Sequence, residues 1–242
     1  MPSPTLQDQR VVVLGGTSGI GLATAALAAD HGARVTVVSS RATSTERALA
    51  TLPAGTTAEL ADLTDSHQVT ALFDRLGPLD HLVYTAGDPL SLAPLDALDL
   101  DAARRFFALR YFSALDAVRA AAPRLRPGGS VTLTSGTAGR RPGPGWSVAA
   151  GICGAIEALV RALAVELAPL RVNAVRAGMV RTPLWSGLPE ADREQLFAGI
   201  AADLPLGRIG EPEEIAASYV HLMGQRFATG TVVTVDGGTL LA

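Results

Sequence analysis

The sequence predicts an α/β fold built on a doubly wound parallel sheet of about seven strands, with helices on both faces. Short β-branched runs alternate with longer stretches rich in alanine and leucine along the 242 residues. Strands that take turns with helices pair in parallel through right-handed crossovers. A glycine-rich turn also stands directly between the first apolar strand and the first helix, which is typical of a ligand-binding sheet.

The expected elements follow from hydrophobic periodicity and from stop signals. Strands are expected at 11–14, 34–38, 57–60, 81–84, 130–134, 171–175 and 231–235. Helices are expected at 19–31, 43–52, 66–76, 99–125, 147–167 and 211–223, several with Ser, Thr or Asp caps before them or Gly or Pro after them. The ligand of such a sheet lies beyond the carboxyl ends of the strands, where the strand order reverses. Every residue of the site should therefore follow a strand.

The composition favours a single domain over residues 1–242. Hydrophobic residues make up 48% of the chain, enough for one large core, and no Pro/Ser-rich linker or charge run divides it. A net charge of −3 and a pI near 5.8 give no electrostatic reason to expect nucleic acid or an anionic membrane as a partner. The amino terminus lacks signal-peptide features, and no segment approaches about 20 uncharged apolar residues. We therefore expect a cytoplasmic protein.

Three residue types limit the chemistry. The one cysteine, Cys153, rules out an internal disulfide and fits a reducing compartment, and a buried, inert thiol is favoured over a nucleophile. The four histidines are scattered, and no spacing indicates a metal site. All 20 basic residues are arginine, so the chain contains no lysine.

The stretch VVVLGGTSGIGLATAALAADHGARVTVV, from 11 to 38, predicts a pyrophosphate-binding loop. Gly15, Gly19 and Gly21 would supply a tight turn, close approach of the backbone to the pyrophosphate, and close contact between helix and strand. The amino terminus of the following helix faces the anion. This context indicates a Rossmann-type, NAD(P)-binding domain.

The end of the second strand, VVSSR, indicates which nicotinamide nucleotide fits. An NAD site places an acidic residue here to hold the ribose hydroxyls. Ser39, Ser40 and Arg41 instead offer hydroxyls and a guanidinium that suit a 2′-phosphate. NADP is therefore favoured over NAD, and the alternative is a solvated turn in which Arg41 is incidental.

With the glycine loop, further stretches make the chain resemble the short-chain dehydrogenase/reductase family over nearly its whole length. ADLTD, with Asp62 and Leu63, resembles the segment of the family that contacts adenine. YTAG at 84–87 stands where the family has NNAG and loses both asparagines. RVNAVRAGMVRTP resembles RVNAVxPGxxxTP and puts Thr182 where the family binds the nicotinamide carboxamide. LGRIGEPEEIA and VVTVDGG resemble the late helix and last strand of the family.

The loop, the second strand end and the resemblance together predict which residues bind the cofactor. They are Gly15, Thr17, Ser18, Gly19, Ile20, Gly21, Ser39, Ser40, Arg41, Asp62, Leu63, Ala86, Gly87, Gly178, Val180 and Thr182. The resemblance also implies a small-molecule substrate, and a homodimer or homotetramer formed through the helices near 99–125 and 147–167.

The catalytic side departs from the family, whose members use an Asn-Ser-Tyr-Lys tetrad. Alignment on VELAP puts the tyrosine at Ala149 and the lysine at Cys153, and counting back from there puts the serine at Gly136. Alignment on AAAPRL puts the asparagine at Arg110. A one-residue slip would restore a serine at Ser135, but no slip restores a lysine. We expect a divergent member with an atypical active site.

Three functions remain open at this point. The first is a redox enzyme in which Ser135, Arg110, Tyr111 or the Arg140/Arg141 pair replaces the lost groups. An arginine stabilises a developing oxyanion but is a poor proton donor, so ketones are less attractive than iminium or conjugated acceptors. The alternative for Arg110 is a salt bridge or a solvated helix face.

The second function is a non-redox enzyme, such as a dehydratase, isomerase or cyclase, in the same pocket. Trp146 and Trp185 would wall an apolar cavity, or else they are ordinary packing residues. The third function is a catalytically silent protein, either a cofactor-binding regulator or a partner subunit.

Overall fold

The computed structural model describes residues 6–90 and 92–242 and contains the predicted sheet. Its strands are β1 (Arg10–Leu14), β2 (Arg34–Ser39), β3 (Thr57–Leu60), β4 (Leu79–Tyr84), β5 (Leu125–Gly136), β6 (Arg171–Ala177) and β7 (Val232–Val235). They pair in the order β3-β2-β1-β4-β5-β6-β7, and every pairing is parallel. The doubly wound parallel fold is confirmed.

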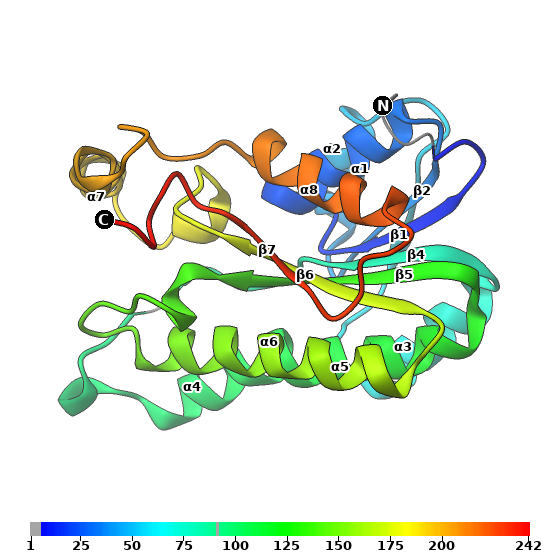
Figure 1. Ribbon diagram of the computed structural model, residues 1–242, viewed down its shortest axis with the longest axis horizontal. Coiled ribbons are helices and arrows are strands. Elements are labelled where there is room, and N and C mark those ends of the chain that lie inside the picture. Colours follow the sequence, from blue (N-terminus) through cyan, green and yellow to red (C-terminus); the bar gives the residue numbers. More distant parts are fainter. Residues whose placement is uncertain (1–5, 91) are drawn as a thin grey trace.

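Helices cover both faces of the sheet (Figure 1). They are α1 (Gly19–Asp30), α2 (Ala42–Leu49), α3 (Ser66–Leu76), α4 (Leu100–Phe107), α5 (Ser113–Ala121), α6 (Ser147–Glu166), α7 (Glu190–Asp203) and α8 (Pro212–Gly224). One buried cluster lies between the sheet and α3, α5 and α6, and a second lies between the sheet and α1 and α8. Among the described residues, α6 is the one helix with the length and apolar composition of a membrane span, and its buried face packs on β5 and β6.

The strand order reverses between β1 and β4. The chain runs outward from β1 to β3 and then returns to place β4 on the other side of β1, where Leu14 pairs with Tyr84. The loops that follow these two strands diverge, and they leave a crevice at the carboxyl edge of the sheet. The site is therefore built at this edge.

Three predictions about the helices were wrong. The helix expected at 99–125 ends at Ala121 because Pro123 opens a short 3-10 turn, and β5 begins at Leu125. The same stretch is not one regular helix, since a π-helical segment, Ala108–Phe112, joins α4 to α5. Helix α7 was missed altogether, because within it only Phe197 is buried and its apolar stripe is weak.

Candidate active site

The glycine loop is closed against its neighbours in a way that leaves no room for side chains. Gly15 has φ +80°, and a Cβ there would lie 2.5 Å from the backbone nitrogen of Ala86. A Cβ on Gly21 would lie 2.3 Å from the Gly15 carbonyl oxygen. The side chain of Ser18, the residue before α1, makes no capping hydrogen bond to the helix. The first-turn N–H groups of α1 are thus left for an anion, as a pyrophosphate site requires.

A cavity of about 400 Å³ runs along this loop and along the ends of β2 and β3. Of the residues predicted to bind the cofactor, it is lined by Gly15, Thr17, Ser18, Gly19, Ile20, Gly21, Ser39, Ser40, Arg41, Asp62, Leu63, Ala86, Gly87 and Thr182. The other two, Gly178 and Val180, line the neighbouring cavity. The structure therefore brings the sequence-predicted residues together around two adjoining cavities.

The far end of this cavity carries Arg41 and the β2 serines. The Arg41 side chain is exposed and forms no ion pair with any described residue. Its backbone N–H donates to Ser39 Oγ at 3.4 Å, which folds the turn around the serine hydroxyl. A free guanidinium beside two hydroxyls fits a phosphate on the adenosine ribose.

The second cavity measures about 490 Å³ and is mainly apolar. Trp146 and Trp185 line it, with ring centroids 6.2 Å apart, and Trp185 packs edge-on against Phe197 of α7 at 6.3 Å. The two cavities share a boundary formed by Ile20, Thr85, Ala86, Arg110, Thr134, Thr182 and Leu184. Helix α7, which the sequence analysis missed, thus supports the aromatic wall of this cavity.

Arg110 lies at that shared boundary and comes from the π-helical segment. Its guanidinium stacks 4.3 Å from the centroid of the Phe106 ring and donates a hydrogen bond to the Asp88 carbonyl. A Cβ on Gly87 would lie 2.4 Å from Arg110 Nη1, so the glycine makes room for the cation. Arg110 Nε is buried and has no hydrogen-bond partner among the described residues.

This cation is poorly compensated. Burial lowers the pKa of Arg110 from its ordinary value. In the part of the chain that the structure describes, no carboxylate forms an ion pair with it, in contrast to Arg140 and Arg176 nearby. The charge of Asp88 offsets part of this effect, but a buried N–H without an acceptor, such as Arg110 Nε, is costly. The arrangement therefore favours a ligand that brings an electronegative atom to Arg110.

Comparison with known proteins assigns the chain to a family. A family model described as enoyl-(acyl carrier protein) reductase matches residues 15–239. The short-chain dehydrogenase/reductase ATR9 of Stachybotrys chlorohalonatus is 37% identical over 254 residues, which cover 98% of this chain and 99% of the relative. The chain belongs to the short-chain dehydrogenase/reductase family. Oxidoreductases of this family bind a nicotinamide cofactor.

Two solved structures share this short-chain dehydrogenase/reductase fold over the full length. The MalC reductase/Diels-Alderase from Malbranchea aurantiaca gives a TM-score of 0.91 at 31% identity and covers 99% of each chain. A small-chain dehydrogenase in complex with NADPH gives a TM-score of 0.83 at 33% identity and covers 98% of this chain and 100% of its own.

In this short-chain dehydrogenase/reductase, small residues occupy the positions that the sequence analysis expects to correspond to the family serine, tyrosine and lysine. Gly136, Ala149 and Cys153 all line the apolar cavity. Burial raises the pKa of the Cys153 thiol despite the N–H groups of Gly136 and Gly139 that point at its sulfur. The thiol stays protonated at neutral pH, and the space of three larger side chains is left to the ligand.

Ser135 lines the apolar cavity, but its hydroxyl is engaged by groups of α6. Its Oγ lies 3.1 Å from Glu157 Oε1 and 3.3 Å from the Cys153 carbonyl oxygen, so its one proton is used inside the protein. Ser135 is therefore a poor substitute for the family serine. Tyr111, another candidate, packs against Phe107 and Phe112 and lines neither cavity.

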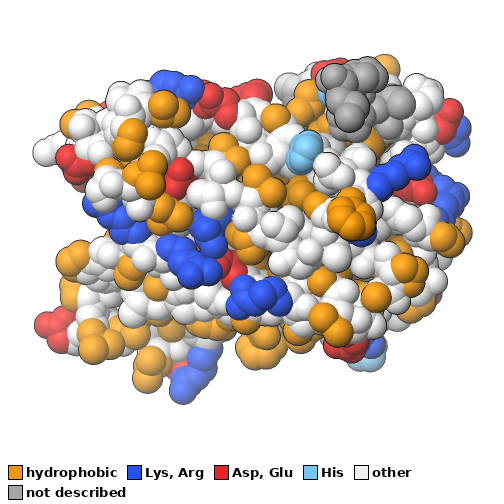
Figure 2. Space-filling model, viewed as in Figure 1, with side chains coloured by type: hydrophobic (Ala, Val, Ile, Leu, Met, Phe, Trp, Pro, Cys, Tyr) orange, Lys and Arg blue, Asp and Glu red, His pale blue; other side chains and the backbone are white. Residues whose placement is uncertain are grey.

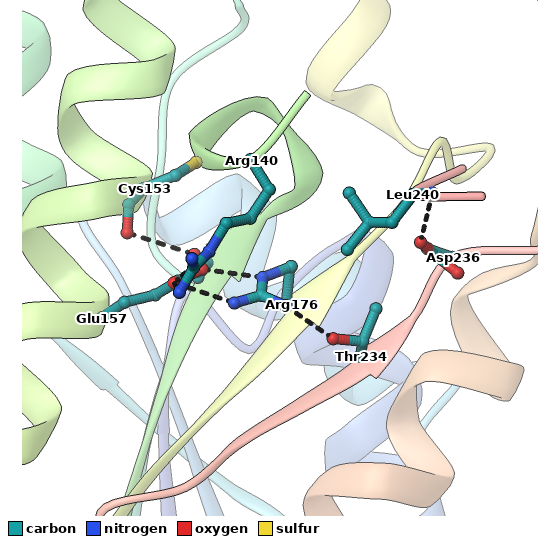
Figure 3. A network of polar contacts seen from close by, with 8 residues as sticks. Arg140, Cys153, Glu157, Arg176, Thr234, Asp236 and Leu240 are labelled. Atoms are coloured by element: carbon teal, nitrogen blue, oxygen red, sulfur yellow. Dashed lines mark hydrogen bonds and ion pairs between the residues drawn. The ribbon is translucent and has the colours of Figure 1, made fainter. Parts of the chain in front are cut away.

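Glu157 organises a polar cluster that the sequence analysis did not find (Figure 3). The carboxylate accepts two hydrogen bonds from Arg176, at 2.7 and 2.8 Å, and two from Arg140, at 3.2 and 3.3 Å. Arg176 also donates to Thr234 Oγ1 at 2.8 Å. We call the set of Ser135, Arg140, Glu157 and Arg176 the Glu157 clasp. It ties α6 to the carboxyl ends of β5, β6 and β7, beside the apolar cavity. No short sequence spacing marks it, because Glu157 and Arg176 lie 19 residues apart on different elements.

Proposed function

We propose that this chain is an NADP(H)-dependent reductase of a conjugated carbonyl compound, with Arg110 taking part of the role that the family gives to tyrosine and lysine. The observation that carries the proposal is that the nucleotide-sized cavity and the apolar cavity meet at Arg110. Bound NADPH would supply the hydride. A substrate in the apolar cavity would then have its reacting carbon at this junction.

The residues of the nucleotide cavity fit the cofactor in all its parts. The loop from Gly15 to Gly21 offers a backbone cradle for the pyrophosphate, and Asp62 and Leu63 lie where the adenine would rest. Arg41 supports NADP rather than NAD, since β2 ends without an acidic residue. The NADPH complex of the dehydrogenase that is 33% identical adds weight to this choice.

Arg110 determines which acceptor is favoured. As hydride reaches the far carbon of a conjugated carbonyl, negative charge develops on its oxygen, and the guanidinium stabilises that charge. Arginine does not give up its proton, so the proton that completes the reduction must come from solvent. An iminium acceptor carries a positive charge that Arg110 would repel. Of the carbonyl, imine and enone acceptors considered from the sequence, the conjugated carbonyl depends least on a proton donor in the protein.

Calorimetric titration with NADPH and with NADH tests the cofactor assignment. We expect NADPH to bind more tightly, and Arg41→Ala to weaken NADPH binding by about tenfold or more while leaving NADH binding nearly unchanged, because one charge-assisted phosphate contact is worth about 1.5–3 kcal/mol. If neither nucleotide binds at millimolar concentration, the reductase proposal fails.

Turnover of enones, followed by nicotinamide absorbance, tests the chemistry in the same protein. Arg110→Met should bind NADPH like the wild type and lose about 10²–10³ in rate, the usual effect of removing one electrostatic stabiliser. An unchanged rate in this variant would exclude the role given to Arg110.

A non-redox cyclase is the second candidate. It is favoured by two observations, the structural match to a protein described as both a reductase and a Diels-Alderase, and the apolar cavity. A cyclase would convert its substrate without any change in nicotinamide absorbance, so product analysis by mass spectrometry separates the two functions. A chain that binds NADPH but converts nothing would instead be a silent regulator or partner subunit.

We also propose that the chain forms a homo-oligomer through α4, α5 and α6. The exposed side of α6 carries Gly151, Gly154 and Ala158, which allow close approach of another helix. Phe112, in the π-helical segment before α5, and Val165, near the end of α6, are 61% and 81% exposed. Burying such side chains in a second subunit is favourable.

A further inference from the structure

We propose that the apolar cavity takes a substrate that bears a carboxylate, and that Arg141 is the residue that anchors it. This inference rests on the proposed function, because it names the substrate class of the same cavity. It depends on the charges around the cavity and on the direction in which two consecutive arginines point.

Two cations line the cavity without forming an ion pair in the described part of the chain. Among the described residues, Arg110 and Arg141 line it and neither forms an ion pair. Directly behind its wall, the Glu157 clasp holds two guanidinium groups against one carboxylate. Figure 2 shows arginine side chains gathered beside the hollow between the α6 and α7 sides of this edge. Asp88 acts electrostatically on Arg110, and Asp236 on Arg176, whereas among the described residues no carboxylate forms an ion pair with Arg141.

Arg140 and Arg141 leave the loop after β5 in different directions. The Arg140 side chain points into the Glu157 clasp, where its Nη2 lies 3.2 Å from Glu157 Oε2 (Figure 3). Arg141 Nη1 instead donates to the Thr239 carbonyl at 2.6 Å. Arg141 and Thr239 both line the cavity. The clasp therefore fixes the loop at Arg140 and leaves Arg141 on the ligand side.

Arg141 retains donors for a ligand. A guanidinium has five N–H groups in a planar fork, and the structure uses one of those of Arg141. Next to it lie Pro142, Gly143 and Trp146, which offer no acceptor side chain. A carboxylate is the group that pairs with such a fork through two parallel hydrogen bonds.

One acidic side chain, Asp203 at the end of α7, is also among the described residues that line the cavity. It is exposed, and it forms no salt bridge with Arg141 in the described part of the chain. If Asp203 rather than Arg141 selected the substrate, a cationic compound would be preferred. The sign of the preferred charge therefore decides between the two residues.

The test uses three ligands of the same shape and different charge: cyclohexanecarboxylate, cyclohexanecarboxamide and cyclohexylmethylammonium. The only two tryptophans of the chain, Trp146 and Trp185, both line the cavity, so tryptophan fluorescence reports its occupancy directly. In the NADP⁺-saturated protein, we expect the carboxylate to bind at least about tenfold more tightly than the amide and the ammonium to bind most weakly, since a charged hydrogen-bond pair is worth more than about 1.4 kcal/mol.

Variants identify the residue responsible. Arg141→Met should reduce carboxylate affinity to that of the amide while leaving the amide unchanged, and Arg141→Lys should keep most of the preference. Arg226→Met, at an exposed arginine that lines neither cavity, is the matched control and should behave like the wild type. Equal binding of carboxylate and amide, a preference for the ammonium, or a preference that survives Arg141→Met would each overturn the proposal. No turnover is measured, so a failure of the reductase activity and a failure of this anchor are separate results.

Discussion

The side chain of Glu157 is 3% exposed, yet its carboxylate is held in the ionised state by two arginines and a serine. Burial by itself would raise the pKa of this carboxyl, but the hydrogen bonds and charge of Arg176, with those of Ser135 and Arg140, bring the pKa below its ordinary value. Removing one partner of such a pair leaves a buried charge, whereas removing both leaves only a packing defect. The Glu157 clasp can therefore be tested as a unit.

We expect Glu157→Met to lower the free energy of unfolding by about 3–5 kcal/mol, because Arg176, 10% exposed, would be left without its counter-ion. The double variant Glu157→Met with Arg176→Met should recover most of that loss. Guanidinium denaturation followed by circular dichroism measures both. A double variant no more stable than the single one would mean that the charge of Arg176 is not what makes the single substitution harmful.

At the scale of elements, α6 has two different faces. Ile152, Ile156 and Val160 are buried against the sheet, while small residues cover much of the outward side. Gly154 lies on that outward side, and a Cβ built on it meets nothing within 4 Å. A large side chain at Gly154 is thus compatible with the fold of one chain and incompatible with close packing of a second chain.

Gly154→Arg should therefore convert an oligomer into a smaller species without loss of stability, since arginine also has the higher helix propensity. Light scattering coupled to size-exclusion chromatography measures the mass. The matched control is Gly199→Arg on α7, where an added Cβ is equally free. An unchanged mass for Gly154→Arg would place the interface elsewhere. The same decrease in mass in both variants would point to a general effect of the added charge.

At the scale of the whole molecule, the two ends of the sheet serve different purposes. The carboxyl end carries the cavities, and the amino end is closed by fixed polar contacts. There, His81 on β4 lies 2.8 Å from Ser130 Oγ on β5 and 2.6 Å from Gln9 Oε1 of the segment before β1. Burial, with the charge of Arg171, lowers the pKa of His81 to about 4, while Asp80 opposes the shift. His81 is thus neutral in the native state.

This histidine should make stability depend on pH. The unfolded chain protonates His81 near its ordinary pKa of 6.5 and the native chain only near 4, so the native state binds fewer protons between these values. Stability is then expected to fall as pH drops from 6.5 to 4, by about 3 kcal/mol for this group. Urea denaturation of the wild type and of His81→Gln across this range isolates the effect, since the difference between them should shrink with falling pH. A constant difference would show that His81 does not titrate in this range.

Much of the nucleotide half of the site could be predicted because its signals are local. Gly15, Gly19 and Gly21 lie close together between β1 and the first turn of α1, and Arg41 follows β2 directly before α2, so short spacings carry the information. The absence of lysine could also be known from the sequence, because it follows from the composition alone. The alternation of strands and helices was sufficient for the sheet and for the edge at which the cavities lie.

The tertiary structure decided what contiguous sequence does not encode. Arg110 faces both cavities because a π-helical segment turns it there and Gly87, from another loop, leaves it room. The Ser135 hydroxyl is engaged because Glu157, on α6, accepts its hydrogen bond. The sequence by itself therefore determined the fold and the gathering of most of the proposed nucleotide-binding residues around one cavity, where neighbours in the chain are neighbours in space. The substrate half was decided only by tertiary structure, because β5, α6, α7 and the carboxyl terminus meet there only after the sheet has formed.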